Sequence, residues 1–344
     1  MSLSRLRYFG AAAVALMLIA ACGGSATPAP AAKQIKVGLV TDTGKLNDKS
    51  FNHLAYVGLQ KAIKDFGIKG DVIESNTGDD YVPNLTNFAS KGYDLVVGNG
   101  FFMQVAIGTV ATQFPNVKFA IIDGAGTDAK FVDLKLPNVM GLSFAEQEPG
   151  ALVGVIAGMM EKTGKAPKNT HVVGAVGGVS IPPVNHYLAG YKWAVTMEDP
   201  SSKVLIGYSN DFNDPAKCKG VATSQIGQKA EFLFQVAGGC GVGVLQAAGQ
   251  AKVWSFGVDA DQKDVDPSVA ASALKKVDVA VYTAINSMVK GTFTSGANLF
   301  NLKNGGVGYQ VDNLTLPADV QTEVDSVAAK IKAGTLTPPA DIPA

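Results

Sequence analysis

The 344-residue sequence has little cysteine, little histidine and no excess of either charge. Three cysteines are too few for a scaffold built on disulfides, and three histidines without ligand spacing argue against a zinc site. Lys plus Arg and Asp plus Glu each total 29, so the charge balance does not indicate a nucleic acid or an anionic surface as the partner.

Sequence patterns of common enzymes are also missing. The chain has no G-x-S-x-G nucleophile turn, no H-E-x-x-H pair and no acidic cluster at metal-ligand spacing. The glycine-rich run 238–243 lacks the Lys-Ser/Thr that completes a phosphate-binding P-loop. We therefore expect a protein that is not an enzyme and that uses no cofactor and no metal.

The N-terminus carries an export pattern. Arg5 and Arg7 precede the mostly apolar run 8–20, which is shorter than the ~20 residues that a spanning helix needs. Residues 19–22, Ile-Ala-Ala-Cys, resemble a bacterial lipobox. We expect a signal peptide over 1–21, lipidation of Cys22 and a flexible tether over 22–33, which would hold the protein on the extracytoplasmic face of the cell membrane. The alternative is an ordinary signal peptide with a chance cysteine.

Hydrophobic residues make up 47% of the chain, enough for a large core, and they fall into alternating strand-like and helix-like segments. This alternation runs from residue 35 to residue 123 and restarts after residue 148. Parallel strands need crossover helices, so two such arrays predict an α/β chain with two lobes of parallel sheets flanked by helices. We expect a first lobe of residues 34–144 plus about 259–290, and a second of residues 145–258 plus about 291–344.

Polar and aromatic residues, with one glycine, gather where the predicted strands end. They are Asp42, Asn99, Asp123, Phe212, Gly239 and Asp259. Ligands of open α/β sheets bind outside the carboxyl ends of the strands. If both lobes turn these ends toward one cleft, the molecule is a hinged trap for a ligand.

Several strings resemble one family in order along the chain. They are Thr41-Asp42-Thr43-Gly44-Lys45-Leu46-Asn47-Asp48-Lys49-Ser50-Phe51-Asn52, Phe119-Ala120-Ile121-Ile122-Asp123, Phe212-Asn213-Asp214-Pro215, Ala237-Gly238-Gly239-Cys240-Gly241-Val242-Gly243, Gly257-Val258-Asp259-Ala260-Asp261-Gln262 and Ser272-Ala273-Leu274-Lys275-Lys276-Val277-Asp278. Together with the lipobox, they are similar to the basic membrane protein family of substrate-binding lipoproteins. Members serve ABC importers and include purine nucleoside receptors.

The resemblance implies a type I periplasmic-binding-protein fold with three crossings between the lobes and a nucleoside ligand, purine favoured. It implies that Phe51 and Phe212 sandwich the base, and that Asp42 and Asp123 accept hydrogen bonds from base or sugar. The remaining candidate ligand contacts are Thr43, Gly239, Asp259 and Lys275, together with Asn99, which is a candidate from its place at a strand end. Asp259 and Lys275 would bind the sugar, Gly239 would allow close backbone approach, and Thr43 replaces an Asn of some nucleoside receptors.

Structural alternatives exist for these residues. Asp48 or Ser50 can cap the helix that follows, Phe51 and Phe212 can be packing residues, and lysines such as Lys275 are mostly exposed. Cys218 and Cys240 can stay free thiols, but an oxidising compartment favours a disulfide.

The expected function is a monomeric solute receptor that passes a nucleoside to ABC permease subunits. A receptor for a sugar or an autoinducer-type furanosyl ligand, feeding transport or signalling, is the alternative. A nucleoside hydrolase is less favoured, because it would need an activated nucleophile or a metal-bound water.

Overall fold

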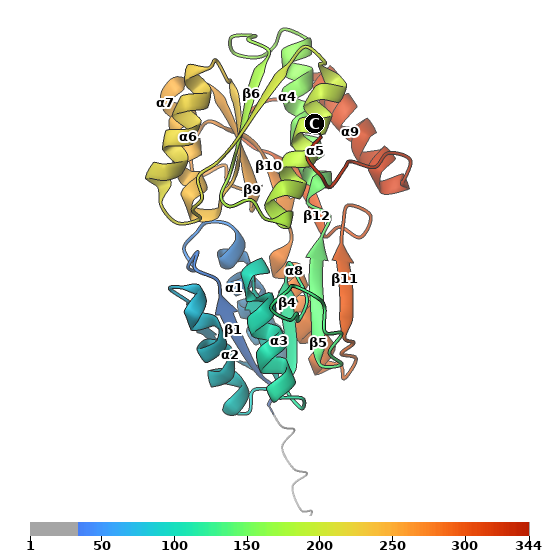
Figure 1. Cartoon of the computed structure of the whole chain (residues 1–344). Coiled ribbons are helices and arrows are strands. Elements are labelled where there is room, and N and C mark those ends of the chain that lie inside the picture. Colours follow the sequence, from blue (N-terminus) through green and yellow to red (C-terminus); the bar gives the residue numbers. More distant parts are fainter. Residues whose placement is uncertain (1–33, 344) are drawn as a thin grey trace, which may run out of the picture. The chain divides into compact units, whose positions relative to one another are not determined.

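The computed structural model describes residues 34–343, in which two six-stranded sheets with flanking helices form two lobes (Figure 1). The α/β architecture expected from the alternating pattern is therefore confirmed. The predicted signal peptide, the tether and Cys22 lie outside the described residues. None of the helices within 34–343 is both long and apolar enough to cross a membrane.

The first lobe is built on a fully parallel sheet with the strand order β11-β5-β4-β3-β1-β2. Its strands are β1 (Lys36–Thr41), β2 (Lys69–Ile73), β3 (Leu95–Asn99), β4 (Lys118–Ile122), β5 (Val139–Phe144) and β11 (Gly296–Phe300). Its helices are α1 (Phe51–Phe66), α2 (Tyr81–Ser90), α3 (Gln104–Gln113) and α8 (Val277–Val289), with the short turns η1 (Gly78–Asp80) and η2 (Phe101–Met103).

The second lobe has the strand order β12-β10-β9-β8-β6-β7, parallel except that β12 runs antiparallel to β10. Its strands are β6 (Val172–Gly177), β7 (Lys203–Tyr208), β8 (Phe232–Val236), β9 (Trp254–Asp259), β10 (Val269–Lys275) and β12 (Val307–Val311). Its helices are α4 (Gln147–Lys162), α5 (Pro182–Glu198), α6 (Pro215–Gly227), α7 (Val242–Ala251) and α9 (Ala318–Ala333), with the short turn η3 (Gly238–Gly241).

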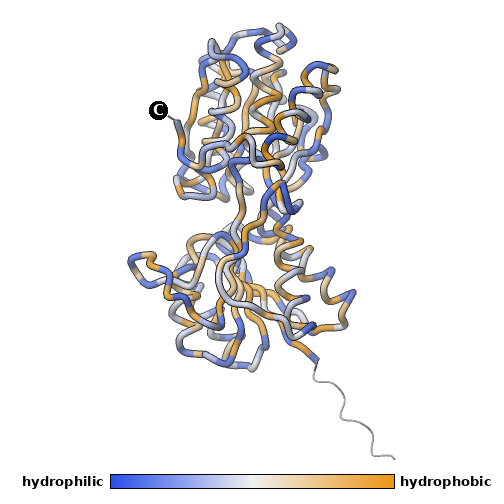
Figure 2. Tube along the Cα trace, turned by 90° about the vertical axis from the view of Figure 1, so that its right-hand side faces the viewer, coloured by the Kyte–Doolittle hydropathy of each residue, from blue (hydrophilic) through white to orange (hydrophobic). Residues whose placement is uncertain are grey.

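The chain crosses between the lobes three times, after β5, after β10 and after β11. The crossing segments are hydrogen-bonded to one another: Ala145 N–H donates to the Phe300 carbonyl at 2.9 Å, and Lys276 N–H to the Gly306 carbonyl at 2.9 Å. Figure 2 shows that these segments form a narrow connection between the lobes. A narrow connection of hydrogen-bonded segments is suited to act as a hinge between the lobes.

The division of the C-terminal third differs from the one predicted. Of the segment 259–290, expected in the first lobe, α8 lies there, but β10 lies in the second sheet beside β9. Of the segment 291–344, expected in the second lobe, β12 and α9 lie there, but β11 pairs with β5 at the edge of the first sheet. Each crossing moves the chain to the other lobe, and the sequence pattern does not mark these points.

Close packing of α4 against α5 positions part of the cleft. A Cβ atom at Gly190 of α5 would lie 2.0 Å from the Gln147 carbonyl oxygen, so only glycine allows this approach. The contact sets the first turn of α4 beside the face of α5 that carries Tyr187. Glu146, at the start of α4, and Tyr187 are both buried next to the cleft.

Candidate functional site

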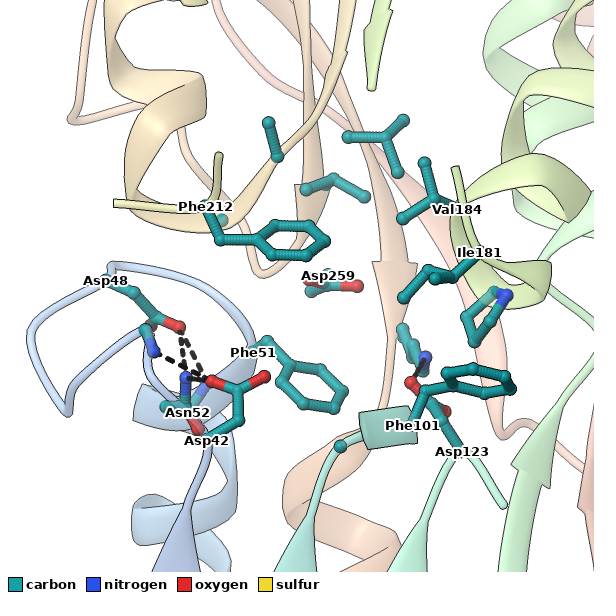
Figure 3. Close-up of a pocket in the computed structure, with 18 of the residues that line it drawn as sticks. Asp42, Asp48, Phe51, Asn52, Phe101, Asp123, Ile181, Val184, Phe212 and Asp259 are labelled. Carbon is teal, nitrogen blue, oxygen red and sulfur yellow. Dashed lines mark hydrogen bonds and ion pairs between the residues drawn. The ribbon is translucent and has the colours of Figure 1, made fainter. Parts of the chain in front are cut away.

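A pocket lies between the carboxyl ends of the two sheets (Figure 3). The cavity between its walls has a volume of ≈ 80 Å³, below the ~300–1,000 Å³ of typical small-molecule sites. Six of the residues expected at a ligand site line it: Asp42, Phe51, Asp123, Phe212, Asp259 and Lys275. They come from both lobes, as a hinged trap requires.

Two phenylalanine rings face the pocket from opposite lobes. Phe51 is the first residue of α1, and Phe212 lies in the loop between β7 and α6. Figure 3 shows both rings pointing into the pocket. The ring of Phe212 rests on Gly178, where a Cβ atom would lie 2.3 Å from the Phe212 ring. The pocket therefore has an aromatic surface on each side.

Lys275 is the centre of a buried charge cluster. Its Nζ donates to Asp123 Oδ2 at 2.7 Å and to Glu146 Oε1 at 3.0 Å, and its side chain is only 2% exposed. His186 Nδ1 lies 3.0 Å from the other oxygen of Glu146. The ammonium also lies 5.1 Å from the centroid of the Phe51 ring. Lys275 thus joins a strand of the second lobe to a carboxylate of the first.

Burial and neighbouring charges shift the pKa values of this cluster. Burial raises the pKa of Asp123 to about 7, although the Lys275 charge offsets part of the rise. Burial alone would lower the pKa of Lys275, but the carboxylates of Asp123 and Glu146 outweigh it and raise this pKa. Burial would raise the pKa of Glu146, but Lys275 and His186 outweigh it and lower this pKa.

Asp259 links the lobes through hydrogen bonds. Its Oδ2 accepts from Ser50 Oγ at 2.7 Å, and its Oδ1 accepts from Tyr187 Oη at 3.1 Å. Burial raises the pKa of Asp259. Asp259 is the last residue of β9, and Asp123 directly follows β4. Both residues have a positive φ, 62° and 65°, a conformation that Asp tolerates better than most residues. Strained residues at the ends of strands are typical of functional sites.

Asp42 is held by an amide network. Its Oδ1 accepts from Gly44 N–H and from Asn52 Nδ2, both at 2.8 Å. Asn52 also donates to Asp48 at 3.1 Å and accepts from Asn99 Nδ2 at 2.8 Å. Burial raises the pKa of Asp42, and it raises that of Asp48 to about 6. Asp48 also accepts from three backbone N–H groups at the start of α1 and so caps this helix.

Two carboxylate oxygens in the pocket remain available. Among the described residues, no donor contacts Asp42 Oδ2, and Asp123 Oδ1 is buried without a hydrogen-bond partner. A buried acceptor without a partner is costly. A ligand that offers N–H or O–H donors would satisfy both atoms.

Three of the expected site residues do not line this pocket. Asn99 is fully buried, and its amide holds Asn52. Thr43 and Gly239 line a neighbouring depression instead. A Cβ atom at Gly239 would lie 3.8 Å from Asp48 of the first lobe, so Gly239 sits where the lobes approach each other.

Cys218 and Cys240 form a disulfide with a Cα–Cα distance of 5.6 Å. The bridge joins α6 to η3, and Cys240 N–H donates to the Phe212 carbonyl at 2.9 Å. The disulfide therefore supports the loop that carries Phe212.

Sequence reasoning missed Glu146, Tyr187 and Asn52 as parts of the site. Asn52 directly follows Phe51 in the segment 41–52 that resembles the family. Its position next to a predicted ligand contact could have identified it as a site residue. Glu146 and Tyr187 enter through the packing of α4 on α5, which no local pattern predicts. Within residues 34–343, no group of three or more His, Cys, Asp or Glu side chains is arranged to hold a metal ion.

Comparison with known proteins gives consistent matches. Residues 35–341 match the family model Bmp, described as ABC transporter substrate-binding protein PnrA-like. The chain is 32% identical to the ABC transporter nucleoside-binding protein BmpA of Lactococcus lactis, over 95% of each chain. It is 35% identical to an uncharacterized lipoprotein of Pyrococcus horikoshii, over 85% of this chain and 73% of the relative.

A solved structure supports the same assignment. The crystal structure of an ABC transporter system solute-binding protein from Aeropyrum pernix matches with a TM-score of 0.79 and 28% identity. The match covers 88% of this chain and 94% of that protein. The two-lobed fold is thus that of ABC solute-binding proteins.

Proposed function

The chain belongs to the family of PnrA-like ABC transporter substrate-binding proteins, and from that premise we propose that its cleft captures a nucleoside, preferably a purine nucleoside. The observation that carries this proposal is the pair of rings, Phe51 and Phe212, that face one pocket from opposite lobes. A flat base would stack on these rings, and aromatic stacking contributes ~0.5–1.5 kcal/mol beyond the burial of area. The BmpA relative is named a nucleoside-binding protein.

The polar atoms of the pocket suit the rest of a nucleoside. The free oxygens of Asp42 and Asp123 accept hydrogen bonds, and ribose hydroxyls and base N–H groups donate them. Hydrogen bonds to a carboxylate are roughly twice as strong as those between neutral groups. Bound nucleoside would then pass to the permease subunits of an importer.

The same carboxylates disfavour a nucleotide. Asp42, Asp48, Asp123 and Asp259 line the pocket, and Lys275 is its one lysine or arginine among the described residues. Lys275 is already paired with two carboxylates. A phosphate would therefore enter a field of like charge, so the proposed ligand is uncharged.

A thermal-shift panel of nucleosides, free bases, nucleotides, sugars and furanosyl autoinducers tests the ligand class. A ligand that binds the native state raises its stability by RT ln(1 + [L]/Kd). We expect shifts with nucleosides and none with the matching 5′-monophosphates. If only sugars raise the melting temperature, the proposed nucleoside ligand is wrong, although the protein is still a solute receptor.

Calorimetry of site variants tests the site itself. Phe51→Ala removes one stacking face, and Asp259→Ala removes a buried acceptor, so each should weaken nucleoside binding by about tenfold or more, ~1.4 kcal/mol. Asp79→Ala, on an exposed turn outside the pocket, is the matched control. Unchanged affinity in both site variants would contradict the proposed site.

Lipid anchoring at Cys22 belongs to the same proposal. It is supported by the lipobox-like sequence and by the Pyrococcus relative, which is named a lipoprotein. Cys22→Ser should move the protein from the membrane fraction to the soluble fraction of expressing cells. Retention of the variant on membranes would contradict lipidation of this residue.

A further inference from the structure

Two aromatic residues of the pocket wall, Phe101 and Phe102, have no part in the site described so far. Phe101, in η2, lines the pocket. Figure 3 places it at the end of the pocket near Asp123 and Ile181, away from Asp42. The second lobe contributes the apolar residues Ile181, Pro183 and Val184 to the pocket wall, so apolar side chains line the pocket together with the charged Asp123.

A second aromatic ring lies behind Phe101. Phe131 stacks on it with a centroid distance of 5.7 Å and an interplanar angle of 9°. Phe131 belongs to the loop between β4 and β5, and 52% of its surface is exposed. The pair therefore runs from the pocket wall to solvent.

The loop that carries Phe131 is tied down at its base and its tip. Thr127 N–H donates to the Gln104 carbonyl at 3.1 Å, and Ala125 N–H to Gln104 Oε1 at 3.2 Å. At the tip, Asp128 Oδ1 accepts from the N–H groups of Lys130 and Val132 at 2.8 and 3.0 Å. These bonds fix the backbone on either side of Phe131.

The backbone of Phe131 is strained, with φ at 61°. A bulky side chain in this left-handed region is uncommon and unfavourable. Burial does not explain why a phenylalanine stands here, because half of its side chain faces solvent. Strain that the fold retains at a partly exposed residue next to a pocket indicates a function for the side chain.

We propose that Phe101 is a third aromatic contact for the ligand and that Phe131 is a positioning residue that holds the Phe101 ring in the pocket wall. This inference rests on the proposed function. It adds that the ligand presents an uncharged, partly apolar group to the Asp123 end of the cleft. Phe131 acts only through Phe101, because it is not part of the pocket wall.

A double-mutant cycle tests this relation, with inosine and adenosine as probes in calorimetry. Phe101→Ala should weaken binding about tenfold, and Phe131→Ala by about threefold to tenfold. In the Phe101→Ala background, Phe131→Ala should change the affinity by less than about twofold, since coupled residues are not additive. Phe131→Tyr keeps the ring and should keep the affinity.

Phe131→Gly separates positioning from a merely structural role. Glycine adopts positive φ without strain, so this variant should melt at the same temperature as wild type or higher, yet bind inosine as weakly as Phe131→Ala. Val132→Ala is the matched control, because Val132 is the next residue, is 58% exposed and does not line the pocket. It should bind like wild type.

The outcomes distinguish this inference from the proposed function. If wild type binds neither inosine nor adenosine, nor any other nucleoside, the proposed function fails and this inference fails with it. If wild type binds and Phe51→Ala loses affinity while Phe101→Ala and Phe131→Ala bind normally, this inference alone is overturned. Additive losses from Phe101→Ala and Phe131→Ala would remove the positioning role of Phe131.

Discussion

Lys275 compensates buried negative charge at the hinge side of the cleft. Removing its charge with Lys275→Met leaves Asp123 and Glu146 buried without their cation. Breaking a buried ion pair in this way typically costs ~3–5 kcal/mol, so we expect a loss of that order in the free energy of unfolding, measured with urea. Lys276→Met, at the adjacent half-buried residue, should change it little.

A second substitution makes this prediction specific. Asp123→Asn in the Lys275→Met background removes one of the uncompensated charges, so the double variant should be more stable than Lys275→Met alone. If Asp123→Asn destabilises both backgrounds equally, the charge pairing inferred from the 2.7 Å contact has no energetic effect.

The raised pKa values predict how stability depends on pH. Burial raises the pKa of Asp123 to about 7 and that of Asp48 to about 6, whereas an unfolded Asp ionises near ~3.9. Between about pH 4 and 7 the folded state holds more protons than the unfolded state, so the free energy of unfolding falls as pH rises through this window. Urea unfolding of ligand-free protein at several pH values measures the fall.

Asp123→Asn is the variant that isolates one of these groups. The substitution removes the titratable carboxyl of Asp123, which has the higher of the two pKa values. The free energy of unfolding of the variant should therefore depend less steeply on pH between about 5 and 7. Identical slopes for wild type and Asp123→Asn would mean that other groups cause the pH dependence.

At the scale of elements, the disulfide between α6 and η3 should stabilise the second lobe. Cross-links that close loops of this size typically contribute ~2–4 kcal/mol, and Cys218 and Cys240 are 22 residues apart. We expect Cys218→Ala/Cys240→Ala to lower the melting temperature. Because the bridge fixes η3, whose backbone N–H at residue 240 donates to the Phe212 carbonyl, we also expect weaker nucleoside binding.

Reduction gives the matched control for this pair. A phosphine reductant should lower the melting temperature of wild type toward that of the double variant and leave the double variant unchanged. An equal effect of the reductant on both proteins would show that the cross-link is not the cause.

Most local elements of the first 260 residues could be predicted because most strands are short apolar runs, but β5 was missed, since the predicted alternation stops at residue 123 and restarts after residue 148. Strand β10 could not be predicted either, although it is buried throughout. Its sequence, Val-Ala-Ala-Ser-Ala-Leu-Lys, is rich in alanine, which favours helices and obscures a strand pattern. Strand β10 was therefore assigned to the wrong lobe, and β11 was misplaced because the sequence does not mark where the chain crosses between the lobes.

The candidate site shows the same limit. Asp42, Asp123 and Asp259 could be predicted because strand ends of a parallel sheet converge on one edge. Tyr187 could not be predicted, because it lies within helix α5 and not at a strand end. Only the packing of α5 brings its hydroxyl to Asp259. Contacts between elements far apart in sequence have no local signature.

At the scale of the whole described chain, the cleft walls are linked by direct hydrogen bonds between lobes. Ser50 of the first lobe donates to Asp259 of the second at 2.7 Å, and Gln262 Nε2 donates to the Lys49 carbonyl at 3.2 Å. Such bonds exist only when the lobes are close together, so they shift the hinge equilibrium toward the closed form. A ligand that contacts both lobes shifts it in the same direction.

Ser50→Ala tests this coupling without disturbing α1, because the Ser50 hydroxyl makes no capping hydrogen bond to that helix. The variant loses one hydrogen bond of the closed form, so it should bind nucleoside more weakly by ~0.5–1.5 kcal/mol. Small-angle scattering should show a larger radius of gyration for the ligand-free variant than for ligand-free wild type. Saturating nucleoside should bring both proteins to the same radius, because the ligand restores closure. Ser90→Ala, at an exposed residue of α2, should leave both quantities unchanged. Weaker binding with an unchanged ligand-free radius would place Ser50 in direct ligand contact and not in lobe closure.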